Sequence, residues 1–201
     1  MAEQQATPTE GEIAWLGGII EGEGTLSLAP TRTGKLGKNG NQYHKITVMV
    51  RLYNSDAGII LKALEIMEKI GVSPHICERE QKPLQLAGRE AYRSQNSMIT
   101  LHIGLMAPAQ LLLQTIRPWL FGEKAKRADI MLRFLDRRLQ MIEDRGARKS
   151  SSGPQGGWKI PYDEEDWKLC SEFLGLTRST KKEFVAGVLN EYEQRTAGYL
   201  L

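Results

Sequence analysis

The spacing of apolar and polar residues predicts a helix and a pair of strands in the first part of the chain. Small apolar residues run into a Glu-Gly-Glu-Gly sequence, which indicates a helix ending near Glu23, with Gly24 reversing the chain. Apolar and polar residues alternate over 25–28 and 45–53, the pattern of half-buried strands. The glycine- and lysine-rich segment 30–41 between them is expected to be a flexible hairpin tip.

The rest of the chain repeats the strand pair and then becomes helical. Asn54, Ser55 and Asp56 favour a helix start, and Gly71 favours its end. Two further strands are expected over 75–81 and 98–105, followed by helices near 107–117, 124–144, 163–174 and 180–194. This order predicts an α+β fold, αββαββα with extra C-terminal helices, whose antiparallel sheet is covered on one face and open on the other.

The length of 201 residues is enough for one domain with a proper core, or at most for a domain with a small appendage. We expect a disordered tail over 1–11, a core domain over 12–147, a linker or mobile loop over 148–160 and a helical cap over 161–201. Apolar runs are too short for a membrane span, and the polar start of the chain is not a signal peptide. With only two cysteines, these features indicate an intracellular protein, of a bacterial or phage cytoplasm or of an organelle.

The distribution of charge is more informative than the net charge of +3. No acid occurs between Glu23 and Asp56, where five basic residues lie, and 117–149 holds ten basic residues against five acids. Clustering of this kind is typical of a surface that binds a polyanion, although a solvated face explains it equally well.

One segment carries a recognisable motif, Leu-Gly-Gly-Ile-Ile-Glu-Gly-Glu-Gly from Leu16 to Gly24. It resembles the nine-residue motif of the LAGLIDADG homing endonucleases, with Gly17 in place of the alanine and with Glu21 and Glu23 in place of the two acids. The alternative is a packed helix with a glycine stop. The strand, loop, strand and helix that follow resemble the same family, and most closely its members that have a single motif and act as homodimers.

The resemblance implies a homodimer in which two copies of this helix cross. Gly18 and Gly22 are four residues apart and share one helix face, so two backbones can approach closely. The expected dimer interface is Leu16, Gly17, Gly18 and Gly22, and Glu21 is expected to cap the end of its own or the partner's helix. Glu23 is the expected metal ligand, with two or more Mg²⁺ (or Mn²⁺) ions shared at the dimer axis.

Two further residues are implied as catalytic. Asn54 stands where the family often has a glutamine near the scissile phosphate, although an N-cap role for Asn54 is equally well supported. Lys124 resembles the lysine that organises active-site water, and the alternative is an ordinary surface lysine. The segment 178–182 resembles a loop that touches the DNA backbone, or is simply a solvated helix start.

Duplex DNA is the expected partner, read in the major groove by the open face of the sheet. We expect DNA contacts from basic, polar and aromatic residues of the strands, the hairpin tip and the C-terminal loop: Arg32, Lys35, Lys38, Asn39, Asn41, Gln42, Lys45, Thr47, Arg51, Tyr53, Thr100, His102, Arg178, Thr180, Lys181 and Lys182.

The resulting hypothesis is a sequence-specific endonuclease, from an intron or another mobile element, that cuts a long near-palindromic site in both strands by metal-dependent hydrolysis. No phosphate-binding loop or dinucleotide motif occurs, so no small-molecule cofactor is expected. The alternatives are an RNA maturase, a DNA-binding protein of the same fold without activity, and a purely structural dimer.

Overall fold

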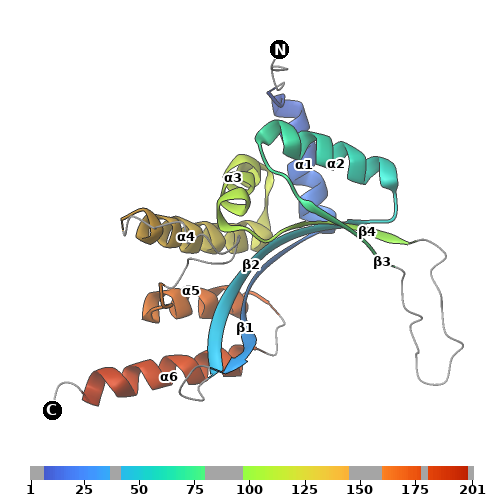
Figure 1. Cartoon of the computed structure of the whole chain (residues 1–201). Helices are drawn as coiled ribbons and strands as arrows, with labels where there is room; N and C mark the ends of the chain where they lie inside the picture. Colours follow the sequence, from blue (N-terminus) through green and yellow to red (C-terminus); the bar gives the residue numbers. More distant parts are fainter. Residues whose placement is uncertain (1–6, 37–41, 80–96, 145–159, 178–180, 199–201) are drawn as a thin grey trace, which may run out of the picture. The chain divides into compact units, whose positions relative to one another are not determined.

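The computed structural model describes residues 7–36, 42–79, 97–144, 160–177 and 181–198 (Figure 1). In chain order these form α1 (Glu10–Glu23), β1 (Gly24–Leu36), β2 (Gln42–Asn54), α2 (Ala57–Ile70), β3 (His75–Arg79), β4 (Met98–Ile103), α3 (Met106–Ile116), the 3-10 turn η1 (Arg117–Trp119), α4 (Gly122–Asp144), α5 (Glu164–Gly175) and α6 (Lys182–Gly198). Within these ranges, every helix is too short or too polar to cross a bilayer.

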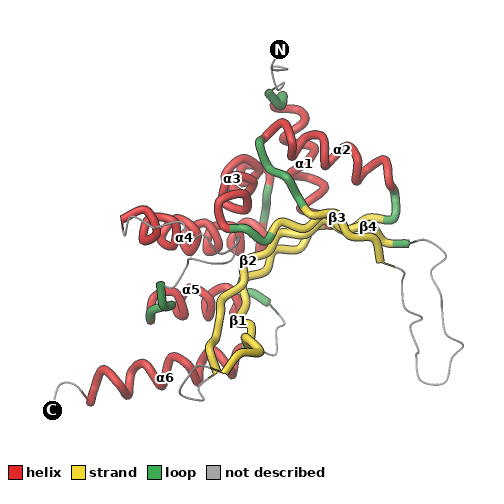
Figure 2. The backbone as a smooth tube through the Cα atoms, in the orientation of Figure 1, coloured by secondary structure: helices red, strands yellow, loops and turns green. Residues whose placement is uncertain are grey.

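The four strands form one antiparallel sheet in the order β1-β2-β4-β3. In the central pair, Val50 lies opposite Ile103 and Tyr53 opposite Thr100, and β3 pairs with the other edge of β4 (Figure 2). One side of β2 is buried through Ile46, Val48, Val50 and Leu52, which together with the sheet order confirms the predicted alternation and fold class.

The chain divides into two compact units, and the boundary passes through β1 and β2. Unit 1 is Met1–Leu26 with Met49–Phe121, and unit 2 is Ser27–Val48 with Gly122–Leu201. Within unit 2, α4 packs against α5, and α5 packs against α6.

In unit 1, α1 packs against α2, α3 and η1, and α2 packs on β4. The helix α1 starts at Glu10, because Thr9 caps it reciprocally with Glu12. The same Glu12 carboxylate lies 2.6 Å from the Lys69 amine of α2, and the Lys69 and Thr9 hydrogen bonds lower the pKa of Glu12 to about 2. This ion pair joins the start of α1 to the end of α2, which stops at Gly71 with a φ of 90°.

Two local predictions near β1 are wrong. Strand β1 extends to Leu36, so most of the expected flexible tip is strand. The rest of the tip, 37–41, lies outside the described residues, and so do the expected loop 82–95 and nearly all of the expected linker. Gly24 does not reverse the chain, since its φ of −81° and ψ of 155° are extended. Glycine is needed there because a Cβ would come within 2.5 Å of the Ile20 carbonyl oxygen.

In unit 2, a buried ion pair joins α4 to α5. Arg138 is 1% exposed and donates to Asp166, which is fully buried, at 3.0 Å. The guanidinium also donates to the carbonyls of Ile160 and Pro161, and its carbon lies 4.6 Å from the centre of the Tyr162 ring. Burial raises the pKa of Asp166, and the charge of Arg138 opposes that shift.

Both strands of the two-stranded ribbon of unit 2 are bonded by residues of α5 and of the segments just before α5 and α6. Cys170 and Lys181 donate to the carbonyls of Leu28 and Pro30 on the edge strand β1, at 3.8 and 3.0 Å. The Tyr162 hydroxyl donates to the Ile46 carbonyl of β2 at 3.1 Å. Because isolated two-stranded ribbons are marginally stable, these contacts give the ribbon a fixed support.

Burial also raises the pKa of the Cys170 thiol to about 12.

Replacing Arg138 by methionine should destabilise the protein strongly, because Asp166 stays buried and loses its nearer cation, which leaves only Arg137 at 3.6 Å. We expect a loss of about 3–5 kcal/mol in the free energy of unfolding, measured by chemical denaturation. Adding the second substitution Asp166→Leu to Arg138→Met should recover part of the lost free energy of unfolding. As a control, Arg133→Met removes the exposed pair with Glu172 and should cost less than about 1 kcal/mol. Equal losses in the two single variants would contradict the prediction.

Candidate metal centre and nucleic-acid interface

The helix α1 has two faces with different roles. Leu16 and Ile20 are completely buried in unit 1. Gly17 is buried against η1, where a Cβ on residue 17 would lie 2.6 Å from the Cβ of Trp119. Leu16 and Gly17, both expected at a dimer interface, are therefore committed to the core of their own chain.

Gly18 and Gly22 lie on the other face and are exposed. A Cβ at either position would meet no atom within 4 Å among the described residues. Since the two glycines share one helix face, this face of α1 presents bare backbone. It is the part of the expected interface that remains accessible.

The two acids of the motif have different surroundings. Glu21 is half-buried and accepts a hydrogen bond from the backbone N–H of Phe121 at 3.2 Å. Phe121 directly precedes α4, so Glu21 satisfies a donor of its own chain where the next helix begins.

Glu23 is the exposed last residue of α1. The C-terminal end of a helix carries partial negative charge, and the last turn of α1 has no basic residue. A carboxylate at this end is unfavourable by itself and favours a bound cation. However, no three His, Cys, Asp or Glu side chains converge on one metal position within the described part of the chain. To hold a metal ion, Glu23 of one copy would therefore need further oxygen donors.

The two other expected catalytic residues lie in different units. Asn54 ends β2 in unit 1, where its side-chain oxygen accepts from the backbone N–H of Asp56 at 2.8 Å. Asp56, and not Asn54, is the N-cap of α2. Lys124 lies in the first turn of α4 in unit 2 and is half-buried.

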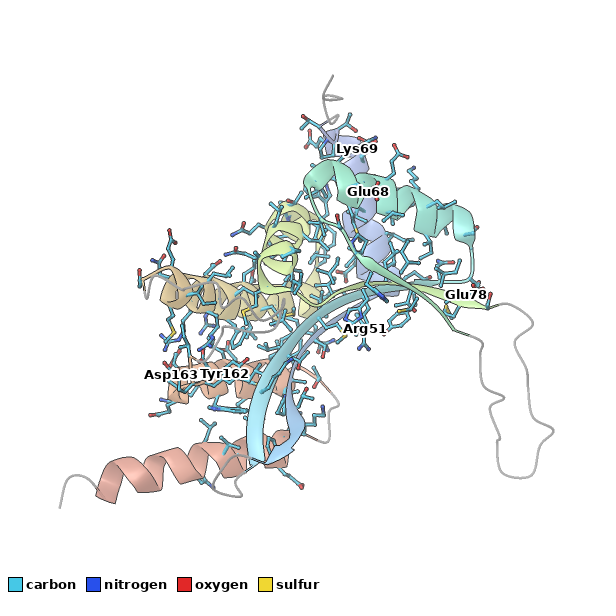
Figure 3. The ribbon with its side chains drawn as sticks, in the orientation of Figure 1. Arg51, Glu68, Lys69, Glu78, Tyr162 and Asp163 are labelled. Carbon is cyan, nitrogen blue, oxygen red and sulfur yellow. The ribbon has the colours of Figure 1, made fainter. Side chains whose placement is uncertain are left out.

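The face of the unit 1 sheet opposite the helices carries nitrogen-bearing and aromatic side chains. Arg51 lies on the side away from α1 and α2 (Figure 3) and donates to the Tyr53 hydroxyl at 3.1 Å. His102 lies opposite Arg51 on β4 and is partly exposed. Thr100 was expected to be open but is only 6% exposed, because it lies between Tyr53 of β2 and Cys77 of β3.

The remaining expected DNA contacts belong to unit 2 or fall outside the description. Lys45 is exposed, and the Thr47 hydroxyl lies 2.9 Å from that of Thr31. Lys181 and Lys182 donate to the carbonyls of Pro30 and Gly175. The strands include Arg32, Lys35 and Gln42, whose side chains are not described, and outside the described residues lie Lys38, Asn39, Asn41, Arg178 and Thr180.

The basic residues of α4 are mostly engaged within unit 2. Arg133 bonds both oxygens of Glu172, Arg137 pairs with Asp163, and Arg127 donates to the Leu176 carbonyl. The excess of basic residues over 117–149 is thus matched in part by the acidic C-terminal helices. It does not by itself define a polyanion-binding surface.

Comparison with known proteins gives a consistent result. No family model matches the chain, and no curated protein matches it. Among solved structures, the homing endonuclease I-CvuI, in complex with its target in the presence of calcium, is 16% identical, with a TM-score of 0.55 over 90% of this chain and 94% of that chain. The homing endonuclease I-TnaI gives 14% identity and a TM-score of 0.53 over 93% and 99%.

The LAGLIDADG homing endonuclease I-GzeII, in complex with its DNA target, is 11% identical, with a TM-score of 0.51. The match covers 86% of this chain but 48% of that chain. The chain has the homing endonuclease fold. The predicted resemblance is confirmed at the level of the fold, and the chain corresponds in length to I-CvuI and I-TnaI and to about half of I-GzeII.

On this homing endonuclease fold, the edge strand β3 also contributes to the open face, which the sequence alone did not reveal. His75 lies opposite His102, and Cys77 lies opposite Thr100. His75 is exposed, and its Nδ1 lies 3.1 Å from the Cys77 sulfur. The signal was present, because His75 and Cys77 alternate with Ile76, but five residues are too few to show which side is buried without the register.

Gly17→Ala should destabilise the protein, because the new methyl group overlaps Trp119. We expect the overpacking, about 1–3 kcal/mol, to exceed the gain of about 1 kcal/mol from helix propensity, and thermal unfolding should show a lower Tm. Gly187→Ala on α6 is the matched control, since a Cβ there meets no described atom within 4 Å. Its Tm should stay equal or rise, and a similar rise for Gly17→Ala would exclude the proposed packing.

Proposed function

We propose that this chain is a LAGLIDADG homing endonuclease, which cuts a long near-palindromic duplex site as a homodimer by metal-dependent hydrolysis. The observation that carries the proposal is the exposed Glu23 at the foot of a helix whose Gly18 and Gly22 face is bare. The homing endonuclease fold and the open, nitrogen-rich sheet face support it.

The proposal requires two copies, since one copy supplies one Glu23 and one open α1 face. Bare backbone at Gly18 and Gly22 allows two helices to approach more closely than side chains would permit. The two Glu23 carboxylates would then lie near each other, where their mutual repulsion favours divalent cations between them. The length of the chain, about half that of I-GzeII, is consistent with this arrangement.

Glu23 fits a hard cation, because carboxylate and phosphate oxygens are the ligands that Mg²⁺ and Mn²⁺ prefer. When bound, such ions would supply Lewis-acid activation of water and charge neutralisation at the phosphate. Lys124 and Asn54 would contribute a positive charge and an amide near the scissile phosphate. Glu21 would act structurally, through its bond to Phe121.

The open sheet face would provide the DNA contacts. Arg51, Tyr53 and His102 in unit 1, with Lys45 and Thr47 in unit 2, present donors suited to base edges and phosphates. Two copies related by a two-fold axis would read two similar half-sites, so the target would be close to a palindrome.

Glu23→Gln should abolish cleavage and leave DNA binding intact, because the amide keeps the size of the side chain and loses the charge that holds the metal. A target selected from a randomised near-palindromic library would be incubated with Mg²⁺ to measure cutting and with Ca²⁺ to measure binding. Glu10→Gln, at the opposite end of the same helix, is the matched control and should cut normally. Cleavage by Glu23→Gln at the wild-type rate would remove the metal role of Glu23.

Gly18→Leu should break the homodimer without unfolding the chain, since the new side chain points into open space in one copy and blocks the approach of a second helix. Sedimentation would give the oligomeric state, and far-UV circular dichroism the fold. Gly187→Leu, on an exposed glycine of α6, should remain dimeric. A dimer of Gly18→Leu that is as stable as the wild type would exclude a helix crossing at this face.

A further inference from the structure

The ribbon of unit 2, residues 27–36 of β1 and 42–48 of β2, extends past the part of the sheet that has four strands. Strand β1 ends the sheet on one side, so its outer edge carries backbone groups without a strand partner. On the other side, β4 ends at Ile103 opposite Val50. Within the described part of the chain, the earlier residues of β2 therefore have no strand beside them there. Carbonyls at both edges of the ribbon need donors from elsewhere.

Two donors of the C-terminal segment bond the outer edge of β1. Leu28 and Pro30 are two residues apart, so their carbonyls point to the same edge of the strand. The Leu28 carbonyl accepts from the Cys170 thiol at 3.8 Å, and the Pro30 carbonyl accepts from the Lys181 amine at 3.0 Å. The bond from Lys181 is the stronger of the two, because its donor is charged and a thiol is a weak donor.

The donor at the other edge is Tyr162, which lies just before α5 (Figure 3) and donates to the Ile46 carbonyl of β2 at 3.1 Å. Its ring is held independently of the hydroxyl, because it stacks on Phe134 of α4 and lies against the Arg138 guanidinium. Burial raises the pKa of Tyr162, so the hydroxyl keeps its proton and remains a donor at neutral pH. Tyr162 and Lys181 thus bond the two edges of the ribbon from opposite sides.

Bonds at both edges restrict the shape of the ribbon. An isolated two-stranded ribbon is marginally stable and can adopt a wide range of twists. When the ribbon is held in advance, less conformational freedom is lost as it meets a ligand. Hydrogen bonds to base edges require a fixed geometry, whereas attraction to phosphates is largely independent of sequence. Loosening the ribbon would therefore reduce discrimination between DNA sequences more than it reduces affinity for DNA in general.

We propose that Tyr162 and Lys181 form a two-sided clamp that positions the ribbon, and that Lys181 acts through Pro30 instead of through a DNA phosphate. Both are positioning residues, whose effect on target discrimination passes through the strands they bond. The role in discrimination rests on the proposed function, whereas the clamp itself is a property of the folded chain. The sequence indicated Lys181 as a DNA contact, but its amine is engaged with the Pro30 carbonyl of its own chain.

Hydrogen exchange of the full chain, followed by mass spectrometry, tests the clamp without DNA. Tyr162→Phe removes only the hydroxyl, and Lys181→Met removes the amine and keeps an unbranched side chain. Ribbon peptides of each variant should exchange about two- to tenfold faster, as expected for one lost hydrogen bond, while peptides of α2 should keep the wild-type rate. Lys181→Arg keeps a charged donor and should restore protection. Unchanged exchange of the ribbon in both Tyr162→Phe and Lys181→Met would overturn the clamp.

Lys168→Met is the matched control for the exchange measurement. Lys168 is exposed on α5, where it pairs with Glu164 one turn earlier. Its replacement removes a lysine amine from the same C-terminal segment without touching the ribbon, so ribbon exchange should stay at the wild-type rate. Circular dichroism confirms that each variant is folded.

Fluorescence anisotropy in Ca²⁺, from about 50 to about 200 mM salt, tests the role in discrimination with a selected target and a duplex of mixed sequence. Tyr162→Phe and Lys181→Met should bind the target about two- to tenfold more weakly, bind the mixed duplex as the wild type does, and keep the wild-type dependence of affinity on salt. Lys45→Met changes an exposed lysine of the ribbon itself and should lower the slope of log affinity against log salt by about 0.9 for one phosphate contact.

The outcomes separate this inference from the proposed function. A salt slope lowered by about 0.9 in Lys181→Met, with equal losses on both duplexes, would identify a phosphate contact and overturn the positioning role. Faster ribbon exchange with unchanged discrimination would likewise reject the role in reading DNA. Binding without cleavage in Mg²⁺ would reject the nuclease and keep the inference. A wild-type chain that binds no duplex would reject the proposed function and the role in discrimination, and the exchange measurement would still decide the clamp.

Discussion

The contact between Gly17 of α1 and Trp119 of η1 sets the orientation on which the site depends. The helix α1 is apolar on several sides, so amphipathicity alone does not decide which side enters the core. A residue larger than glycine at position 17 would overlap Trp119. With Gly17 inside, helical geometry turns Gly18 and Gly22 outward, and Glu23 ends the helix in solvent.

The sequence alone was enough to predict the elements whose formation depends on neighbouring residues in the chain. The alternation over 45–53 and the Asp56 and Gly71 ends of α2 are visible in the residues themselves. The extension of β1 to Leu36 is not visible in the residues, because long-range contacts override glycine and lysine propensity there. Cys170 of α5 and Lys181, just before α6, bond the carbonyls of Leu28 and Pro30. Gly24 was expected to reverse the chain, whereas its close approach to Ile20 appears only when α1 and β1 are assembled.

The candidate site likewise combines features that are visible in the sequence with features that appear only in the folded chain. The motif identified Glu21, Glu23 and the glycines, but four similar interface positions separate into two buried and two exposed only with tertiary packing. Charge counting left the role of the basic residues of α4 open, because Arg133, Arg137 and Arg138 pair with acids that lie more than twenty residues away. Register, which sequence does not supply, placed His75 beside His102.

Two features of α1 are unfavourable for a single copy of the chain. Glycine within a helix costs about 1 kcal/mol relative to alanine, and none of the described residues packs against the Cβ positions of Gly18 and Gly22 in one copy. A carboxylate at the negative end of a helix is also unfavourable, and Glu23 has no basic residue in the same turn. A second copy on the bare face would use the glycines, and a divalent cation would offset the charge. A second copy bound on this face, with a divalent cation, would thus account for both unfavourable features of α1. A chain that acts as a monomer would leave both of them unexplained.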